Sequence, residues 1–595
     1  MVDVSEDPHR QWLTAVGERA RTDQIPAGSV LAAVARACAA PNGVGPGATP
    51  LLAGAFGDPP QWSEIGPAPP EAIRTPDLVG QAAEVLTAPD DRRSQGVHYT
   101  PAPIAERLVA QVVVPDRSPP TVCDPAVGGG AFLLAVARHL VASGHDVRAV
   151  VERLAGVDLE PLAVAAAETA LVLLAAEHSV QVDPGGLVEA DALVKSVDRF
   201  PRRPDGGYDL VLGNPPFGGQ LRGATRRAAS EQTAMKDRFG TAAAAYTDRS
   251  SLFLLLALEL VRPGGRVQLI LPRSMLVARD AGPARERLLR QATLDAVWVD
   301  EDESFDAAVR VCAVTATRAG SGRTTAVSGG AAPAVRMPAP RAGDVTASWG
   351  SLLATTGGVP AVELVGPALG SIASATAGFR QQYYGLVPFV REEAAGAGMP
   401  LVTSGLIEPA EMRWGATPCR FARRRWSAPV VDDEALRVDD PVLGSWLDAR
   451  RCPKVLVASQ TRIIEAVADP SGRMVPSVPV VSVEPTDPQD VWRVAALLLA
   501  PATSAWMLHH RAGSGLSADT VRVSARSVTA LPLPGHRDHW DHAAELVQQW
   551  HAEPADADVR RRFALAACAA QGVSESERVE LVQWWIGQVE RSADA

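Results

Sequence analysis

Lysine is nearly absent from this chain: only Lys195, Lys236 and Lys454 occur among its 595 residues. Nuclease sites of the Asp/Glu-x-Lys type need an acidic residue two positions before the lysine, but leucine, alanine and cysteine occupy those positions. A phosphate-binding loop of the Gly-Lys-Ser/Thr type needs glycine directly before the lysine, and valine, methionine and proline stand there instead. The sequence therefore argues against a lysine-dependent nuclease or an ATP-driven translocase, and any cleavage partner is expected to be a separate protein.

Paired cysteines and long apolar runs are missing as well. The six cysteines are scattered without a Cys-x-x-Cys pair, which predicts reduced thiols in a cytoplasmic protein, not zinc ligands or a disulfide framework. The most apolar stretch, 252–261, falls far short of the roughly 20 residues that span a bilayer, so we expect a buried helix and no membrane partner. Residues 1–7 lack a basic start followed by an apolar run, so no signal peptide is predicted.

The glycine pattern of dinucleotide-binding sites is also incomplete. Residues 121–134 predict a strand end, a turn at Gly128-Gly129-Gly130 and a helix start, which together let a ligand approach the backbone closely. The Gly-x-Gly-x-x-Gly spacing fails, because Ala131-Phe132-Leu133 follow the triple glycine. The sequence therefore predicts a ligand-binding turn and disfavours a nicotinamide cofactor.

Acidic residues stand at the ends of successive predicted strands. Asp124 precedes the glycine turn, Asp158 lies at the tip of the next strand, and Asp191 follows a third apolar stretch. Pro161 then opens a predicted helix over 162–177. Taken singly, each acid is the usual helix cap or solvated loop residue. Helix caps and solvated loops do not explain three such acids at successive strand ends, followed by Asn214 at a fourth strand end.

The tetrapeptide Asn214-Pro215-Pro216-Phe217 ends the apolar run 208–213 and is the most informative feature of the chain. An exocyclic amine of adenine or cytosine is a poor nucleophile, because its lone pair is delocalised into the ring. An asparagine side-chain oxygen and the carbonyl of the following proline can each accept one N–H and localise that lone pair. Two successive prolines keep this backbone rigid. The alternative is a simple turn that closes a buried strand.

The series resembles the S-adenosylmethionine-dependent N6-adenine DNA methyltransferases of type I and type II restriction-modification systems. The match is to the gamma-type motif order, in which the cofactor motifs precede the catalytic motif and target recognition lies C-terminal. Residues 95–101, which include Tyr99-Thr100-Pro101, resemble the family's N-terminal cofactor motif. The resemblance covers about residues 94–317. It implies S-adenosyl-L-methionine as the cofactor, double-stranded DNA as a partner, and a separate restriction or defence subunit as a further one.

By this resemblance, Asp124 faces the methionine amino group, Asp158 the ribose, and Asp191 with Ala192 the adenine ring. Asn214 and Pro215 activate the target amine, and Phe217 stacks on the base. The implied cofactor-binding residues are Tyr99, Thr100, Pro101, Asp124, Ala126, Gly128, Gly130, Phe132, Asp158, Leu159, Asp191 and Ala192. The implied catalytic residues are Asn214, Pro215, Pro216 and Phe217, with Phe217 and Phe305 on the substrate base.

Two basic segments are candidates for DNA contact in spite of the net charge of -11, because phosphate binding depends on the local field. Residues 413–426 hold five arginines, three aromatics and no acid, although a solvated charged loop explains this run equally well. The segment after the tetrapeptide is also basic and continues to Lys236 and Arg238. The predicted DNA-binding residues are Arg222, Arg226, Arg227, Arg420, Arg423, Arg424 and Arg425.

Three histidines, His536, His539 and His542, recur at intervals of three. Residues with that spacing turn away from one face of a helix, and Pro534-Gly535 before them marks a helix start. The pattern predicts an exposed helix terminus, and no metal is proposed.

The expected fold class is α/β, with a doubly wound, mostly parallel seven-stranded methyltransferase sheet. We expect a helical N-terminal region (1–90), a catalytic domain (91–320), a linker or excursion rich in small residues (321–370), an α+β target-recognition domain (371–535), and one or two C-terminal helices (536–595). Methylation of cytosine N4, of RNA or of protein glutamine remains an alternative. So does a non-catalytic nucleic-acid-binding defence subunit.

Overall fold

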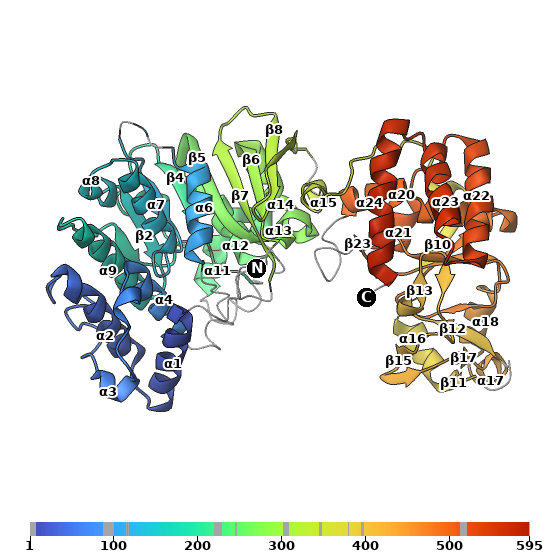
Figure 1. Cartoon of the computed structure of the whole chain (residues 1–595), viewed down its shortest axis with the longest axis horizontal. Coiled ribbons are helices and arrows are strands. Elements are labelled where there is room, and N and C mark those ends of the chain that lie inside the picture. Colours follow the sequence, from blue (N-terminus) through green and yellow to red (C-terminus); the bar gives the residue numbers. More distant parts are fainter. Residues whose placement is uncertain are drawn as a thin grey trace. The chain divides into compact units, whose positions relative to one another are not determined.

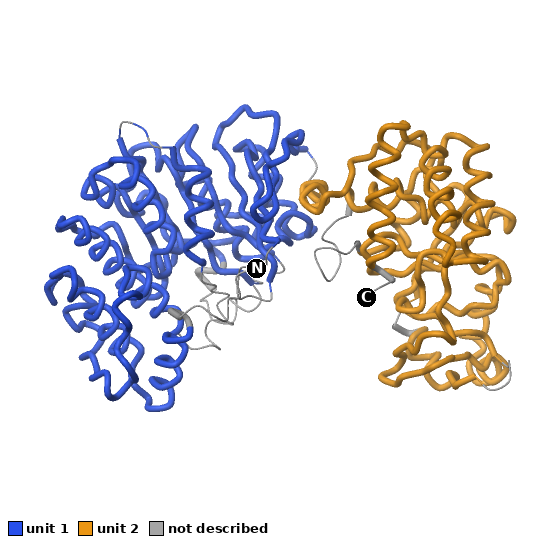
Figure 2. Tube along the Cα trace, viewed as in Figure 1, with its two compact units in different colours: residues 1–347 blue, residues 348–595 orange. Residues whose placement is uncertain are grey.

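The chain forms two compact units, residues 1–347 and 348–595, which Figure 2 shows in blue and orange. The computed structural model describes residues 8–86, 100–114, 116, 118–218, 229–243, 247–301, 309–343, 348–378, 380–393, 398–511 and 521–593.

The first unit is built on a nine-stranded sheet with the strand order β3-β2-β1-β4-β5-β7-β6-β8-β9 (Figure 1). The strands are β1 (Val122–Asp124), β2 (Leu154–Asp158), β3 (Leu187–Glu189), β4 (Tyr208–Gly213), β5 (Val261–Pro272), β6 (Ala292–Val299), β7 (Val311–Arg318), β8 (Thr324–Gly329) and β9 (Val335–Pro338). β7 is antiparallel to β5 and β6, β9 is antiparallel to β8, and the other neighbours are parallel. The strand order reverses between β1 and β4, which is where open α/β sheets bind ligands.

Helices cover both faces of this sheet, as the doubly wound prediction requires. α6 (Ala102–Val112), α7 (Ala131–Ala142) and α9 (Pro161–Glu177) share one buried cluster with Leu210 and Leu212 of β4. Because side chains alternate along a strand, Val211 points to the other face. α12 (Arg249–Leu260) packs there on β4 and β5, and α14 (Gly282–Gln291) packs on β6. The predicted fold class is confirmed, with nine strands in place of the expected seven.

The two additional strands correct the expectation for 321–370. β8 and β9 lie in a segment that we predicted to be a linker or an excursion because it is rich in Gly, Ala, Ser and Pro. β8 pairs in parallel with β6 and buries Val327, so tertiary pairing overrides a composition that is typical of loops. Residues 341–343 continue back along α14, where the Gly343 N–H donates to both carboxylate oxygens of Glu286 (3.1 and 3.0 Å).

The N-terminal helices pack directly on the catalytic sheet's helices. They are α1 (Pro8–Thr22), α2 (Ala27–Ala39), α3 (Trp62–Ile65) and α4 (Pro76–Leu86). Leu78, Val79 and Ala82 of α4 share a buried cluster with Ala165 and Ala166 of α9. A buried hydrogen bond joins the hydroxyls of Thr49 and Thr169 (2.9 Å). This region is therefore continuous with the core of the first unit.

The second unit combines two small sheets with helices. One sheet has the order β10-β22-β18-β20 and the other β11-β17-β12-β21. Their strands are β10 (Ala373–Ala377), β22 (Val481–Pro485), β18 (Lys454–Val457), β20 (Ala466–Asp469), β11 (Val390–Glu392), β17 (Pro429–Val431), β12 (Met399–Val402) and β21 (Val475–Pro476). The principal helices are α15 (Gly350–Thr356), α16 (Arg380–Leu386), α17 (Asp433–Asp439), α18 (Pro441–Asp448), α19 (Val491–Leu499) and α20 (Pro501–Arg511).

The C-terminal part forms three helices where one or two were expected: α22 (Arg537–Ala552), α23 (Ala557–Ala570) and α24 (Glu575–Ala593). Pro554 interrupts the first connection, and Gly572 adopts a left-handed conformation (φ 77°) in the second. His536 precedes α22 as the N-cap residue, so the predicted helix start is confirmed.

Among the described residues, no single helix has the length and apolar character that would span a bilayer. One pair bent by 60°, residues 488–499 with 501–510, passes the same test jointly. Val494, Leu498 and Met507 of this pair are fully buried in the second unit.

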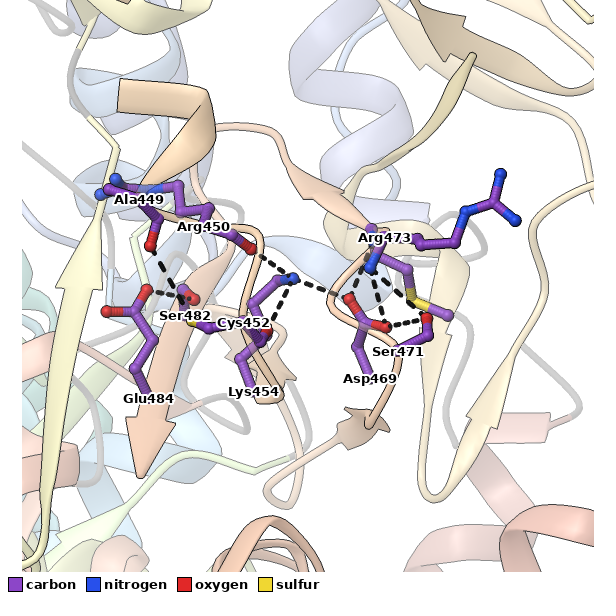
Figure 3. Close-up of polar contacts among 10 residues, drawn as sticks. Ala449, Arg450, Cys452, Lys454, Asp469, Ser471, Arg473, Ser482 and Glu484 are labelled. Atoms are coloured by element: carbon purple, nitrogen blue, oxygen red, sulfur yellow. Dashed lines mark hydrogen bonds and ion pairs between the residues drawn. The ribbon is translucent and has the colours of Figure 1, made fainter. Parts of the chain in front are cut away.

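A fully buried ion pair joins β18 to β20 in the second unit (Figure 3). Lys454 Nζ donates to Asp469 Oδ2 (2.7 Å) and to the carbonyl of Arg450 (2.8 Å), and both side chains have no exposed surface. Asp469 also accepts from the Met474 N–H (2.8 Å) and the Ser471 hydroxyl (2.7 Å). This pair fixes the connection between the two strands.

Candidate active site

The predicted site residues of β1, β2 and β4 lie in one row, because these parallel strands are neighbours and end at the same edge of the sheet. Asp124 ends β1, Asp158 ends β2, and Asn214 follows β4. Gly213 (φ 154°) packs against the Asp124 carboxylate so closely that an added Cβ would lie 2.9 Å from its Cγ. The residue before the tetrapeptide therefore touches the first carboxylate of the cofactor motif.

Asp158 holds the glycine turn. The Gly128 N–H donates to its Oδ2 (2.8 Å), and the Glu160 N–H donates to its Oδ1 (3.0 Å). Gly128 has a positive φ of 49°, and a Cβ there would meet no atom within 4 Å. A carboxylate has about four acceptor positions, so Asp158 keeps acceptor capacity for ligand hydroxyls beside an open stretch of backbone.

The Asp124 carboxylate is buried, and no basic side chain forms an ion pair with it in the described part of the chain. It is 2% exposed, and its Oδ1 accepts one backbone hydrogen bond, from the Ala126 N–H (3.0 Å). Burial raises the pKa of Asp124 to about 8, with a further increase from the charge of Asp158, and burial also raises the pKa of Asp158.

Asn214 is oriented by the N-terminal cofactor motif. Its Nδ2 donates to the hydroxyl of Thr100 (3.1 Å), a residue that is 4% exposed and lies just before α6. Because the amide nitrogen is engaged on this side, Oδ1 lies at the opposite end of the amide. Thr100 thus links the predicted cofactor segment to the predicted catalytic residue across more than a hundred positions of sequence.

Other predicted side chains fall into two groups. Leu159 is 53% exposed at the tip of β2, as suits an apolar surface for a ligand ring. Phe132, Ala192 and Phe217 are buried. Phe217 is 5% exposed and belongs to the cluster beneath the sheet, so in this conformation its ring is not open to a base. Receiving a base there requires a rearrangement of the neighbouring chain.

Five predicted residues lie outside the described residues: Tyr99, Arg222, Arg226, Arg227 and Phe305. Of the basic residues beyond the tetrapeptide, Arg238 has a structural role. Its side chain pairs with Glu259 (2.8 Å) and donates to the carbonyls of Leu193 (2.9 Å) and Lys195 (3.1 Å). The end of α11 (Ala229–Phe239) is thereby attached to the loop that follows Asp191.

Sequence reasoning missed Asp248, which fixes the chain just after the tetrapeptide. Its Oδ2 accepts from the Gly218 N–H (2.9 Å), and its Oδ1 caps α12 by accepting from the Ser250 N–H (2.9 Å). An aspartate directly before an apolar helical run is a recognisable N-cap, so the sequence carried this signal. The exit of the tetrapeptide is therefore anchored to a helix terminus.

The arginine-rich run of the second unit folds as a β-hairpin. β15 (Cys419–Phe421) and β16 (Arg424–Trp426) pair with Arg420 opposite Arg425. Ala422 (φ 50°) and Arg423 (φ 64°) form the two-residue turn, as a hairpin whose turn matches the strand twist requires. The Ala422 N–H donates to the Tyr383 hydroxyl (2.9 Å), which attaches the turn to α16.

The aromatics and arginines of the hairpin differ in exposure. Phe421 and Trp426 are buried. The four predicted DNA-binding residues are exposed, and within the described structure none of them forms an ion pair: Arg420, Arg423, Arg424 and Arg425. Like charges placed directly opposite destabilise a strand pair, so an external anion would relieve this arrangement.

Among the described residues, no group of three or more His, Cys, Asp or Glu side chains is arranged to hold a metal ion. His542 instead lies 3.6 Å from Glu545 on the exposed surface of α22.

The fold defines a class of protein: a doubly wound α/β protein in which Asn214 lies at the switch point, the usual ligand-binding edge of such sheets. Residues 74–310 match the profile of the N-6 DNA Methylase family. Within the chain, this segment is similar to that family, which confirms the resemblance found in the sequence. S-adenosyl-L-methionine is accordingly its cofactor.

Comparison with solved structures extends the similarity beyond the catalytic segment. The chain is similar to the type IIL restriction-modification enzyme MmeI, solved in complex with DNA, with 13% identity, a TM-score of 0.55, and coverage of 99% of this chain and 95% of that one. It also matches the type IIG restriction endonuclease BpuSI at 12% identity and a TM-score of 0.46, over 98% of this chain and 80% of that one. The M protein of the type I restriction enzyme EcoKI matches at 18% identity and a TM-score of 0.28, over 43% and 48%.

The residues at the edge of the sheet fit S-adenosyl-L-methionine. The buried Asp124 carboxylate suits a cationic ammonium, which would favour its ionised form. Asp158 suits the ribose hydroxyls, and the open backbone at Gly128 admits a ligand at close approach. When bound, the sulfonium of this cofactor supplies an electrophilic methyl group.

The raised pKa of Asp124 predicts pH-dependent cofactor binding. Without cofactor, Asp124 in the folded chain stays protonated up to a pH of about 8, because burial raises its pKa to that value. An ordinary aspartate carboxyl has a pKa of 3.8. If Asp124 holds the ammonium of the cofactor, binding requires the ionised carboxylate, so it should expel this proton and weaken as pH falls below about 8. Between pH 6 and pH 7.5 we expect the affinity to rise by up to about tenfold per pH unit. Calorimetric titration in buffers of different ionisation enthalpy measures both the affinity and the proton release.

Asp124→Asn is the matched control for this measurement. The variant has no carboxyl proton to expel, so its affinity should be lower and nearly independent of pH in the same window. A wild-type affinity that stays flat from pH 6 to pH 7.5, without proton release, would contradict the prediction.

Proposed function

We propose that this chain is a site-specific DNA methyltransferase that transfers the methyl group of S-adenosyl-L-methionine to the N6 amine of an adenine. The single observation that carries the proposal is the position of Asn214. It follows β4 at the switch point, next to the Asp124 carboxylate through Gly213, with its amide oriented by Thr100. Restriction-modification or phage defence is the proposed setting, and a separate restriction or defence subunit is a proposed partner.

The proposed chemistry is the activation of a weak nucleophile by two fixed acceptors. Asn214 Oδ1 and the carbonyl of Pro215 each accept one N–H of the exocyclic amine, and this favours a tetrahedral nitrogen with its lone pair directed at the methyl group. The target base reaches these acceptors after it rotates out of the duplex stack. Pro216 keeps the backbone rigid, and Phe217 turns out of its cluster to stack on the base. Catalysis then comes mainly from positioning and electrostatics.

The cofactor is held by the remaining residues of the edge. Asp124 binds the ammonium, Asp158 binds the ribose hydroxyls through its remaining acceptor positions, and Asp191 accepts from the adenine amine. Tyr99, Thr100 and Pro101 cover the methionine end. The backbone of the turn, from Ala126 to Gly130, forms the floor of this site.

Base identity is tested by incubating the chain with duplex DNA and the cofactor and then sequencing the modified bases. N6-methyladenine in a defined sequence context supports the proposal. Methylation of cytosine N4 instead would keep the mechanism and change the base, because both amines pose the same chemical problem. Methyl transfer to RNA or to glutamine side chains, with none to DNA, would show that DNA is not the substrate and would overturn the proposal. Cofactor binding without transfer to any substrate would favour a non-catalytic nucleic-acid-binding defence subunit.

We assign target recognition to the second unit, with the hairpin β15–β16 as a phosphate-contacting surface. The support is the exposure of four arginines that have no acidic partners in the described structure. Tyr384 on the neighbouring α16 is 66% exposed, and its ring packs edge-on against Tyr383, whose hydroxyl holds the hairpin turn. Charge complementarity with a polyanion relieves the repulsion between Arg420 and Arg425.

Removing two of these charges should weaken DNA binding in a salt-dependent way. For Arg420→Gln combined with Arg425→Gln, we expect the slope of log affinity against log salt to become shallower by about 2. The measurement is a fluorescence anisotropy titration of duplex DNA at several salt concentrations. Arg562→Gln, which removes an exposed arginine on α23, is the control and should leave the slope unchanged. An unchanged slope in the double variant would remove the hairpin from the interface.

A further inference from the structure

The glycine turn of the active site rests directly on α4, backbone against backbone. A Cβ added to Gly80 of α4 would lie 2.5 Å from the carbonyl oxygen of Gly129 and 3.1 Å from its carbonyl carbon. In the reverse direction, a Cβ at Gly129 would lie 2.5 Å from Gly80 Cα and 2.7 Å from its oxygen. No side chain separates the two segments at this point. Gly129 is the middle residue of the turn, directly after Gly128, whose N–H is bound by Asp158.

α4 is fastened on both sides of this contact. In the first turn of α4, the Asp77 carboxylate forms a bidentate ion pair with Arg138 of α7, and the Arg138 Nη1 to Asp77 Oδ1 distance is 2.8 Å. α7 is the helix that begins where the glycine turn ends. Along the rest of α4, buried apolar side chains pack on α9. α4 therefore contacts both the glycine turn and α7, the helix that follows the turn.

A second contact from the same part of the chain reaches the catalytic residue. After α4, the described chain resumes at Thr100, whose hydroxyl accepts from Asn214 Nδ2. Gly80 thus contacts the glycine turn, and Thr100 contacts the amide of Asn214. A glycine inside a helix costs stability relative to alanine, and at Gly80 the close approach explains why alanine is not used.

We infer that α4 is a positioning element for the cofactor turn, and that docking of the N-terminal helical region and binding of S-adenosyl-L-methionine stabilise each other. The inference rests on the proposed function only for the identity of the ligand. Gly80 is a positioning residue: it touches neither cofactor nor substrate and acts through Gly129. By thermodynamic linkage, cofactor bound at the turn must in return strengthen the docking of α4.

The test compares Gly80→Ala with Gly587→Ala in the full chain. Both substitutions replace a helical glycine by alanine, but a Cβ at Gly587 meets no atom within 4 Å. For Gly80→Ala we expect the affinity for S-adenosyl-L-methionine, measured by calorimetry, to fall by at least about tenfold. Gly587→Ala should keep the wild-type affinity. At saturating cofactor the turnover of Gly80→Ala should recover, because the substitution acts on binding and not on the transfer step.

Hydrogen exchange supplies a readout that a purely structural role would not move. In the wild-type chain, added cofactor should slow amide exchange in α4, and in Gly80→Ala this protection should be lost. Should Gly80→Ala fail to fold, Asp77→Asn loosens α4 from α7 without added bulk, and its cofactor affinity should fall in the same direction.

The outcomes separate this inference from the proposed function. Equal cofactor affinity in the wild type and in folded Gly80→Ala, with no cofactor-dependent protection of α4, would overturn the inference and leave the function intact. An unfolded Gly80→Ala together with an unchanged affinity in Asp77→Asn would overturn it as well. A wild-type chain that binds no S-adenosyl-L-methionine would overturn both.

Discussion

Replacing Asn214 with alanine is expected to reduce methyl transfer to DNA by about a thousandfold or more, because a preorganised acceptor aimed at the reacting group is lost. Cofactor affinity should be nearly unchanged. Asn214 Nδ2 is bound to Thr100, whereas the buried carboxylate of the site belongs to Asp124, which keeps its backbone hydrogen bond in this variant. The measurement pairs a single-turnover assay on duplex DNA with a calorimetric titration of S-adenosyl-L-methionine.

The chain offers a natural control for this experiment, because it contains only one other asparagine, Asn42. Asn42 ends a short helical turn in the N-terminal region, far in sequence from the tetrapeptide. Asn42→Ala should retain wild-type transfer and cofactor affinity. Full activity of Asn214→Ala would end the proposed mechanism. Loss of cofactor binding along with activity would show instead that Asn214 acts by shaping the cofactor site.

Replacing Lys454 with methionine is expected to destabilise the second unit by about 3–5 kcal/mol, because it leaves the fully buried Asp469 carboxylate without its cation. The network in Figure 3 explains the size of this effect: Lys454 also bonds the carbonyls of Arg450 and Cys452, so three acceptors lose their donor together. Urea unfolding, followed by a signal from the second unit, measures the loss as a shift in that unit's transition.

Two further variants define the origin of the effect. Adding Asp469→Asn to Lys454→Met removes the buried charge and keeps an oxygen for the Met474 N–H, so part of the stability should return. Arg562→Met breaks an exposed ion pair with Asp558 (3.8 Å) and should cost at most about 0.5 kcal/mol. A loss in Lys454→Met no larger than this would show that the pair contributes little. A cofactor affinity that falls with it would show that the two units are coupled.

The catalytic segment could be predicted closely, because its signals are local. The row of Asp124, Asp158 and Asn214 follows from parallel strands whose carboxyl ends meet at one edge, and each strand end is marked by a residue that suits its ligand. The helix expected over 162–177 corresponds to α9, since Pro161 fixes its first turn. Local signals, namely a proline at a helix start and polar side chains at strand ends, therefore account for most of this prediction.

The second unit was predicted less completely, because its determinants are not local. The run 413–426 gave the arginines, but the sequence could not separate its two faces. Pairing of Cys419 with Trp426 turns Phe421 and Trp426 inward and puts Arg420 and Arg425 on the opposite face. In the first unit, β8 was missed because its partner β6 lies elsewhere in the chain, and β9 pairs with β8 alone.

By itself, the sequence determined which acceptors, carboxylates and arginines the protein contains and in which order they follow the strand ends. Only the tertiary structure decided which distant groups meet. Three contacts illustrate this: Thr100 with Asn214, Gly80 with Gly129, and Lys454 with Asp469. Nothing in the local sequence of either partner indicates that the two residues are neighbours. The physical reason is that close packing and hydrogen-bond satisfaction select partners in space, while residue type and spacing specify only local structure.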